Sequence, residues 1–587
     1  DDRALDTNDK YNPQRLPTTI KTIIEARLDL LDETSRNLLS MAAAIGRTFK
    51  FQVLTLISDL PEDTVVDALE IWLARGLVVE TSSGYDFSHD KIRAVAYEEM
   101  SRARRRIIHR RIAQALEANI DENHQSHPAH LSSHYNLSDT PLNALPYLLQ
   151  AGDKALAVRS YHEAREFGHQ AMRLLRQMPD RANNHQQERL DLNLQLATAY
   201  AFTGDIDRAL PILREAERFA RGLEDEKRLA RIFHRSAQLL WLRNQSRLAD
   251  EYARRLLRSA EELDDSALLH AALRMLGRVG IVLSSYDDAI AYLLRYLKLD
   301  DANSLNQPPP DLPVAYGYLA VAYARVGSWQ RAFDAVQRGV DLATPNNISS
   351  ALAVAHVNQA FIYSERQDWA RCLEIAQRVD PFCEEIDFSP YCFMAQSLIG
   401  RAMAHLGDTQ EGVAILSQAL ADAEKAGHKV FTYIVQLFYA DALIQDSKPQ
   451  RALRYLDETN AVIDETDDRW AKAVHHRLQA EARTRLAKPD WLAIERNLIE
   501  ATTLLRQVRA RPDLARTYAT LRRLYDRAGQ LAWAVDCHFR ATSIFEELGM
   551  TTELREAQGY ASKGQRGAVV IPDLALQGPH QTQSKEY

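Results

Sequence analysis

Four histidines follow one another at steps of three, three and four residues: His124, His127, His130 and His134. Imidazole nitrogens are common ligands of divalent metals, and this spacing could place several of them on one face of a helix. However, Pro128 interrupts any single helix through the group, and no acid or thiol completes an obvious ligand set. We therefore expect a mostly solvated histidine group in a linker and no metal site.

A second group of reactive side chains is basic. The segment 101–111 contains no acid and six arginines: Arg102, Arg104, Arg105, Arg106, Arg110 and Arg111. Such a run could bind nucleic acid. The same segment also carries an apolar stripe, which predicts an amphipathic helix with one basic face: Ile107, Ile108, Ile112 and Leu116. We expect this face to be solvated or to contact its own protein; contact with a phosphate-binding domain is the second alternative and free nucleic acid the third.

Motifs of catalysis and cofactor binding are missing from the sequence. There is no phosphate-binding G-x-x-x-x-G-K-[ST] loop, no nucleophile elbow, and no H-E-x-x-H, C-x-x-C or G-x-G-x-x-G motif. We therefore expect no catalytic residue, metal or cofactor in this chain. Four cysteines are too few for a disulfide framework in 587 residues, which favours reduced thiols: Cys372, Cys383, Cys392 and Cys537.

Composition limits the classes of partner. The chain is 46% hydrophobic and 26% charged, and its net charge of −8 gives no overall attraction to nucleic acid or anionic lipid. No apolar run is long enough to span a membrane, and the acidic start DDRALDTNDK is no signal peptide. We expect a cytoplasmic protein without a membrane partner. Because the chain lacks an initiating Met, we also expect it to be a piece of a longer polypeptide.

A small residue recurs along the chain at intervals of mostly 40 or 41 residues, each time at the start of an apolar helical stretch. One period held over so many residues is typical of a solenoid. It predicts about ten helical hairpins in a mainly α fold. The members of the series are Ala164, Ala209, Ala249, Ala289, Ala332, Cys372, Gly412, Ala452, Ala493 and Ala534.

The residues around each small residue also recur. A tyrosine precedes it by nine residues in four repeats, a leucine lies four residues earlier in three, and a turn glycine often separates the two helical patterns. Over residues 145–550 this resembles the tetratricopeptide repeat. The period of about 40 exceeds the family's usual length of about 34, and the closing Pro is missing, which longer helices would explain. HEAT-type repeats are the alternative, although they do not favour the step from Tyr to Ala.

The block before the repeats, residues 17–115, has another pattern. Three helical stretches, the last at 61–76, precede two β-prone runs joined by the turn TSSG, which is the order of a winged helix. A DNA-binding winged helix would place its third helix in the groove and contact phosphates with Lys and Arg. This helix instead carries Glu62, Asp63, Asp67 and Glu70, and we expect no direct contact with nucleic acid.

The same block, with the segments FSHDKIRAVAY (87–97) and RRRIIHRRIAQALE (104–117), resembles the winged-helix part of bacterial STAND-type signalling NTPases. In that family a P-loop domain precedes this part and a tetratricopeptide superhelix follows it. The resemblance implies that ATP or ADP binds an upstream domain. It also implies that His89 contacts the ADP phosphate and that Asp90 caps the next helix. The alternative is that His89 is a strand-end residue bonded to local backbone.

These expectations combine into one domain plan: a linker (1–16), a winged-helix domain with the following helix (17–115), a connecting helical segment (116–144), the superhelix (145–550) and a mostly disordered tail (551–587). By resemblance, the chain is the regulatory arm of a STAND-type transcriptional regulator. Its superhelix would bind a protein, a peptide or a small inducer, and its winged helix would contact the NTPase domain. The alternatives are a stand-alone tetratricopeptide scaffold and an arm fused to a kinase or cyclase.

Overall fold

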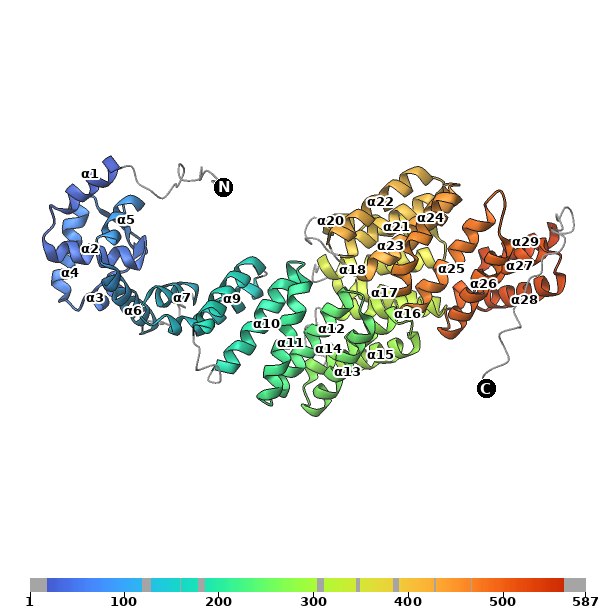
Figure 1. Cartoon of the computed structure of the whole chain (residues 1–587), viewed down its shortest axis with the longest axis horizontal. Helices are drawn as coiled ribbons and strands as arrows, with labels where there is room; N and C mark the ends of the chain where they lie inside the picture. Colours follow the sequence, from blue (N-terminus) through green and yellow to red (C-terminus); the bar gives the residue numbers. More distant parts are fainter. Residues whose placement is uncertain are drawn as a thin grey trace, which may run out of the picture. The chain divides into compact units, whose positions relative to one another are not determined.

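The chain is described here by a computed structural model (Figure 1). It describes residues 18–118, 128–158, 160–177, 185–302, 311–344, 349–383, 390–426, 429–465 and 467–563. The expected linker 1–16, His124, His127 and the end of the tail lie outside these ranges. Within them no helix is both long and apolar enough to cross a lipid bilayer. The chain divides into two compact units, 1–219 and 220–587.

Unit 1 begins with helices that surround a small antiparallel sheet of order β1-β3-β2. Its strands are paired with Phe49 opposite Tyr85 and Val79 opposite Asp86. The elements are α1 (Thr18–Leu28), α2 (Glu33–Ile45), β1 (Thr48–Phe49), α3 (Phe51–Ser58), α4 (Glu62–Ala74), β2 (Val78–Thr81), β3 (Gly84–Phe87), α5 (Asp90–Glu98) and α6 (Arg102–Ala118).

Local signals explain the ends of these helices. The Asp32 carboxylate accepts a hydrogen bond from the Ser35 amide at 2.9 Å and so caps α2, and Gly76 ends α4 with a φ of 60°. The fully buried Trp72 donates its indole N–H to Ser35 Oγ at 2.9 Å, which ties α4 to α2. The predicted hairpin is confirmed as β2 and β3. The prediction of only three helices before it was wrong, because α3 has eight residues and is too short to show a clear period.

The rest of unit 1 already contains repeat hairpins. Its elements are α7 (Pro128–Leu137), η1 (Pro141–Ala144), α8 (Leu145–Ala157), α9 (Tyr161–Arg176), α10 (Gln186–Phe202) and α11 (Ile206–Gly222). The division between the units falls inside α11. Contacts run without a break from α7 through α8 and α9 to α10, so the first hairpins pack with the block that precedes them.

Unit 2 is an α-solenoid with one continuous apolar core from Leu273 to Met550. Its helices are α12 (Glu226–Leu242), α13 (Ser246–Glu262), α14 (Ser266–Val282), α15 (Tyr286–Ala302), α16 (Leu312–Arg325), α17 (Trp329–Ala343), α18 (Ser349–Glu365), α19 (Trp369–Gln377), α20 (Asp380–Cys383), α21 (Pro390–Leu406), α22 (Thr409–Ala426), α23 (Lys429–Gln445), α24 (Pro449–Glu465), α25 (Arg469–Thr484), α26 (Trp491–Gln507), α27 (Arg511–Arg527), α28 (Leu531–Glu547) and α29 (Thr551–Lys563).

The periodic small residues do what their spacing predicts. Every one of them lies in the second helix of a hairpin and is buried. At α21 and α22 the approach is closest, since a Cβ on Gly412 would overlap the backbone of Gly400. Most helices are 17 residues long, for example α12, α13 and α14, which accounts for the long period. The turn glycines are confirmed too: Gly204, Gly327, Gly407 and Gly529 all have positive φ.

Unit 2 curves until distant hairpins touch along a seam. The Ser284 hydroxyl, after α14, donates to Asp468 Oδ1 at 2.8 Å and accepts from the Trp470 amide at 3.0 Å, across 184 and 186 residues. Arg509 and Asp287 form an ion pair at 2.9 Å at the same place. These contacts close the superhelix, so that side chains on the inner face of α16–α27 become interior.

Two expectations about the second half need correction. Residues from Thr551 onward were assigned to a mostly disordered tail, but α29 continues the superhelix and half-buries Leu554 and Ala557 against its core. Reduced thiols were expected, but Cys383 at the end of α20 and Cys392 in α21 form a disulfide, because the two helices bring their Cα atoms to 5.8 Å. Cys372 and Cys537 are free and buried.

Candidate functional site

The histidine group predicted from the sequence is only partly solvated. His130 is exposed on α7, but His134 is buried and lies against His109 of α6, with 2.9 Å between their Nδ1 atoms. His134 Nε2 lies 3.2 Å from His130 Nε2, and His109 Nε2 lies 2.8 Å from the Tyr97 hydroxyl. The solvated interpretation was therefore wrong for His134. Its partner is a histidine that the spacing could not suggest.

This row of rings is a chain of hydrogen bonds and not a set of ligands around one point. Each imidazole uses one nitrogen toward each neighbour, so the three rings do not converge on one point. Burial and the charge of Arg105 lower the pKa of His109 to about 4. Burial, His130 and His109 lower the pKa of His134 to about 3. Nowhere in the described ranges do three His, Cys, Asp or Glu side chains form a group that could hold a metal ion.

The basic face of α6 is used within unit 1. Arg110 pairs with Asp139 at 2.7 Å, Arg111 pairs with Asp59 at 2.8 Å, and Arg105 covers the Tyr97 ring. The prediction of contacts within the protein is thus confirmed for these three arginines. Ile107, which was expected in the apolar stripe, is exposed instead.

His89 is the N-cap residue of α5, and its exposed side chain makes no cap hydrogen bond. Asp90 is not the cap, because it lies in the first turn of α5 and pairs with Arg47 at 3.3 Å. The side chain of His89 is therefore accessible from outside unit 1. Its contact with a nucleotide phosphate stays a prediction.

The most structured candidate site is a cavity of about 140 Å³ inside unit 2. It is lined by the first helices of successive hairpins, α18, α21, α23, α25 and α27, which present charged and aromatic side chains to it. The sequence analysis could not say which residues of the superhelix bind. We call this space the interior cavity.

On one side of the interior cavity a single carboxylate organises an arginine and a histidine. Asp441 Oδ2 accepts from Arg401 Nε and lies near His405 Nε2, both at 3.0 Å. The His405 ring is stacked on Trp369 with 3.9 Å between centroids, and the Arg401 guanidinium lies over Phe438. Burial alone would raise the pKa of Asp441, but His405 and Arg401 hold it well below its usual range. The carboxylate is therefore ionised at neutral pH.

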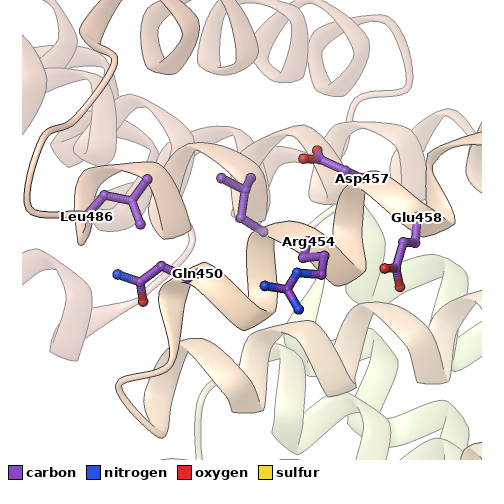
Figure 2. Close-up of a pocket in the computed structure, with 6 residues that line it drawn as sticks. Gln450, Arg454, Asp457, Glu458 and Leu486 are labelled. Atoms are coloured by element: carbon purple, nitrogen blue, oxygen red, sulfur yellow. The ribbon is translucent and has the colours of Figure 1, made fainter.

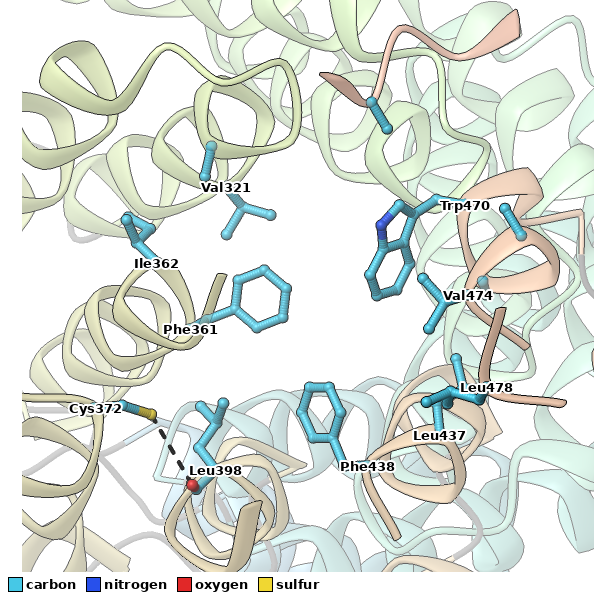
Figure 3. Close-up of a cluster of buried hydrophobic side chains, with 14 of the residues drawn as sticks. Val321, Phe361, Ile362, Cys372, Leu398, Leu437, Phe438, Trp470, Val474 and Leu478 are labelled. Atoms are coloured by element: carbon cyan, nitrogen blue, oxygen red, sulfur yellow. Dashed lines mark hydrogen bonds between the residues drawn. The ribbon is translucent and has the colours of Figure 1, made fainter. Parts of the chain in front are cut away.

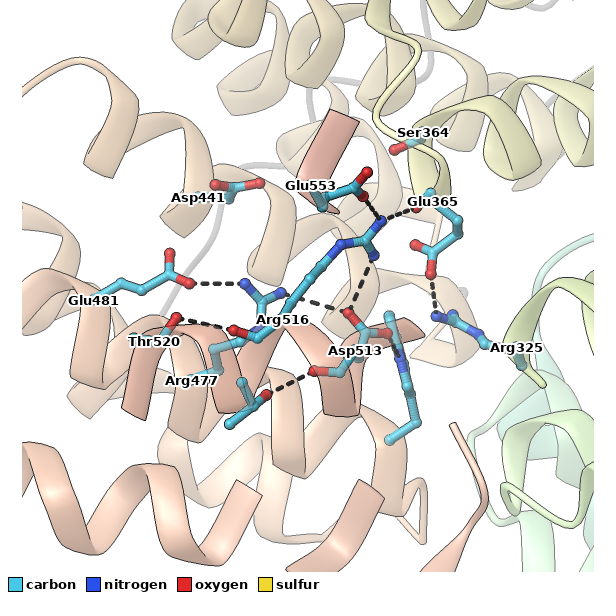
Figure 4. A network of polar contacts seen from close by, with 12 residues as sticks. Arg325, Ser364, Glu365, Asp441, Arg477, Glu481, Asp513, Arg516, Thr520 and Glu553 are labelled. Carbon is cyan, nitrogen blue, oxygen red and sulfur yellow. Dashed lines mark hydrogen bonds and ion pairs between the residues drawn. The ribbon is translucent and has the colours of Figure 1, made fainter. Parts of the chain in front are cut away.

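The other side is a connected set of ion pairs (Figure 4). Asp513 accepts from Trp470 Nε1 at 2.7 Å and lies within 3.6 to 3.8 Å of Arg516 and Arg477. Arg477 donates to Glu481 at 2.8 Å. Burial by itself would raise the pKa of Asp513, and the nearby arginines lower it instead. This carboxylate is also kept charged.

Arg325 lies next to this set in the closed superhelix. Its guanidinium is paired with Glu365 at 3.1 Å and lies 3.2 Å from the centre of the Trp470 ring. Both side chains are about 95% buried, and Arg516 donates to the Glu365 backbone carbonyl. Buried charged side chains thus connect α16, α18, α25 and α27.

Apolar side chains also line the interior cavity. Figure 3 shows Phe361, Phe438, Trp470 and Val474 directed toward one another across the interior, with Leu478 beside them. Phe438, Trp470, Val474 and Leu478 line the interior cavity, and all four are at most 5% exposed. The lining therefore combines charged and apolar side chains on the same helices.

A larger hollow of about 510 Å³ lies on the surface along α24, lined by Gln450, Leu453, Arg454, Asp457, Glu458 and Leu486 (Figure 2). Its charged side chains are exposed, so they are screened by water and contribute little to binding. The interior cavity is the better candidate, because its charges are fixed in position and shielded from solvent.

A weak signal for the interior cavity was present in the sequence. Five of its charged residues, on successive first helices, alternate in sign: Glu365, Arg401, Asp441, Arg477 and Asp513. They follow one another at steps of 36, 40, 36 and 36 residues, mostly shorter than the period of about 40, so their place shifts from the last residue of α18 to the first turn of α27. Trp369 of α19 packs against His405 of the next hairpin, and its ring also lines the interior cavity.

No family model matches the chain. An uncharacterized protein of Rhizobium meliloti (strain 1021) is 25% identical over 178 residues, which are 30% of this chain and 17% of that protein. The chain thus aligns with only a small part of this relative's length.

Several solved structures are similar in helix arrangement. A STAND protein with a tetratricopeptide repeat sensor from Pyrococcus horikoshii is 13% identical, with TM-score 0.47 over 77% of this chain and 68% of that chain. The APC/C hetero-tetramer Cut9–Hcn1 is 13% identical, with TM-score 0.45 over 87% of this chain and 92% of that chain. A Rap protein complexed with Competence and Sporulation Factor is 13% identical, with TM-score 0.42 over 63% of this chain and 99% of that chain. At these values the similarity carries no argument about activity or partner.

Proposed function

We propose that the chain is the ligand-sensing and regulatory arm of a STAND-type, ATP-dependent signalling protein that acts in transcriptional regulation. Residues 17–115 form a winged helix that contacts a nucleotide-binding domain outside the chain. The superhelix binds an effector, which is a protein, a peptide or a small molecule. The arm itself catalyses no reaction in this proposal, and ATP or ADP belongs to the partner domain.

The interior cavity is the observation that carries the proposal. Replacing buried ion pairs by apolar residues of similar volume is often neutral or stabilising, so a solenoid that only has to be stable gains little from them. Here Arg325, Glu365, Asp441, Arg477 and Asp513 are nonetheless almost fully withdrawn from water. A fixed set of charges around an open space is the arrangement expected of a binding site.

The winged-helix assignment is supported by the order of elements. A helix (α2), a strand (β1), two helices (α3, α4) and a hairpin (β2, β3) follow one another, and β1 completes the sheet. The four acids of α4 are exposed, which disfavours DNA in favour of a protein partner: Glu62, Asp63, Asp67 and Glu70.

The phosphate role of His89 is supported by its position. Its side chain is exposed at the start of α5, where backbone N–H groups and the helix dipole favour an anion. In a closed state the imidazole would donate to the β-phosphate of ADP.

The test uses the protein in which this chain and the NTPase domain are joined. We expect His89→Ala to release bound ADP at least tenfold faster, measured by displacement of a fluorescent ADP analogue, because one hydrogen bond to a charged group is lost. His162→Ala, an exposed histidine of α9, is the matched control and should leave the rate unchanged. Unchanged release from His89→Ala removes the assignment of His89, and a purified protein that binds no nucleotide refutes the switch as a whole.

A further inference from the structure

The interior cavity holds two hydrogen-bond donors that the protein does not satisfy. Arg477 Nε and Arg516 Nε are shielded from solvent, and neither has an acceptor among the described residues. Their side chains are 13% and 10% exposed and line the interior cavity. Leaving a buried donor without a partner costs about 1–3 kcal/mol. These two N–H groups could therefore donate hydrogen bonds to an oxygen acceptor of a ligand.

The acids of the lining do not compete for this role. Each already lies in an ion pair: Glu365 with Arg325, Asp441 with Arg401, Glu481 with Arg477, and Asp513 with Arg516. The Asp513 pairs are long, at 3.6 Å to Arg516 and 3.8 Å to Arg477. A second oxygen anion therefore displaces no short hydrogen bond to Asp513, while Arg477 stays paired with Glu481 at 2.8 Å and Arg516 with Glu553 at 2.9 Å.

Apolar side chains also line the interior cavity, beside the charged ones. Phe438, Val474 and Leu478 contribute them and are at most 5% exposed. A polar group placed against them would lose its hydrogen bonds to water without replacement. An apolar group of the ligand meets no such penalty.

Size limits the occupant to something like one amino-acid residue. The interior cavity measures about 140 Å³, and a cavity of roughly 150 Å³ holds one benzene molecule. Gln367 is exposed and Trp369 half-buried, so the space is reached from the turn between α18 and α19. A folded surface cannot enter.

We propose that the interior cavity binds a small apolar monocarboxylate, with the carboxylate on Arg477 Nε and Arg516 Nε and the apolar group against Phe438, Val474 and Leu478. This inference rests on the proposed sensing function and names its ligand class. The shared chemistry has two sources, a free acid or amino acid and the C-terminal residue of a peptide. A carboxylate accepts from both arginines at once, which a neutral amide cannot do equally well.

Binding is measured by calorimetry on this chain alone, with 4-methylpentanoate, L-leucine and the peptide Ala-Ala-Ala-Leu. Each is paired with its amide: 4-methylpentanamide, leucinamide and the C-amidated peptide. We expect at least one acid to bind and its amide to bind roughly tenfold more weakly or not at all. Binding of the free acids identifies a metabolite as the source, and binding of the peptide acid alone identifies a C-terminus.

Arg477→Gln should abolish the preference for the acid, and Arg454→Gln, in the outer hollow, is the matched control that should keep it. The acid–amide comparison needs no variant, so it stands even if Arg477→Gln does not fold. Equal binding of acids and amides, or no binding of any acid, overturns the proposal. Because no nucleotide is present, such a result refutes the ligand class and leaves the ADP experiment as the separate test of the switch.

Discussion

The pair His109–His134 should make unit 1 sensitive to mild acid. Both side chains are at most 4% exposed, and burial is the largest cause that lowers their pKa values, to about 4 and about 3. An unfolded histidine has a pKa of about 6.5. Below that pH the histidines bind protons in the unfolded chain but not in the folded unit, so the free energy of unfolding falls as the pH falls. Above about pH 7 the pair contributes no pH dependence.

The magnitude follows from the pKa differences. Between pH 7.5 and pH 5 an unfolded histidine becomes protonated below its pKa of about 6.5, while His109 and His134 in the folded unit stay neutral. Over the roughly 1.5 pH units from 6.5 to 5, the free energy of unfolding therefore falls by about 2 kcal/mol for each histidine. The two together approach about 4 kcal/mol. The positive charge of Arg105 over Tyr97 and the neighbouring His130 act in the same direction, because both oppose a charged imidazole.

Hydrogen exchange read by mass spectrometry on peptides of α6 and α7 measures this loss, after correction for the intrinsic pH dependence of exchange. Protection should fall by about a thousandfold from pH 7.5 to pH 5 in the wild type. His134→Gln does not titrate and should remove about 2 kcal/mol, or roughly thirtyfold, of that fall. The exposed His162→Gln should behave like the wild type. An equal pH dependence in His134→Gln and wild type would refute the reasoning.

Three further predictions concern unit 2. Glu365→Gln leaves a buried guanidinium unpaired and should lower the free energy of unfolding in urea by about 3 kcal/mol. Glu374→Gln, in an exposed pair, should lower it by less than about 0.5 kcal/mol. Equal losses in the two variants would contradict the buried ion pair. Gly412→Ala should lower the free energy of unfolding in urea by about 1–3 kcal/mol, because the new Cβ meets the backbone of α21; an unchanged free energy of unfolding would exclude that close approach. With the disulfide Cys383–Cys392 intact, the denatured protein should show two reactive thiols to Ellman's reagent and four after reduction; four before reduction would refute it.

Local features of the fold were predictable from the sequence because local interactions decide them. A small residue is required where two helices approach closely, and a residue tolerant of positive φ is required where a helix ends. Ala332 and Gly327 show both requirements within one hairpin, and both are found as predicted. The short helix α3 was not predicted, because its eight residues contain only two turns of apolar pattern.

The burial of the candidate site was not predictable, for the opposite reason. A charged residue on the first helix of a hairpin has the sequence pattern of a solvated face, and only closure of the superhelix buries it. Arg325 is the clearest case: its aromatic partner Trp470 lies many repeats away along the chain. The pair His109–His134 is similar, since one member comes from the arginine-rich helix and the other from the histidine group.

Closure and the interior cavity share one residue, Trp470, so the proposed ligand binding is linked to the shape of unit 2. The Trp470 indole donates to Asp513 at the interior cavity, and its backbone N–H donates to Ser284 at the seam, 186 residues away. The same ring stacks on Arg325. A ligand carboxylate that draws Arg477 away from Asp513 changes the charge facing Trp470, and Trp470 cannot shift without loosening the seam. A ligand with different affinity for the closed and loosened seam would shift the balance between them, which is what a sensing arm requires.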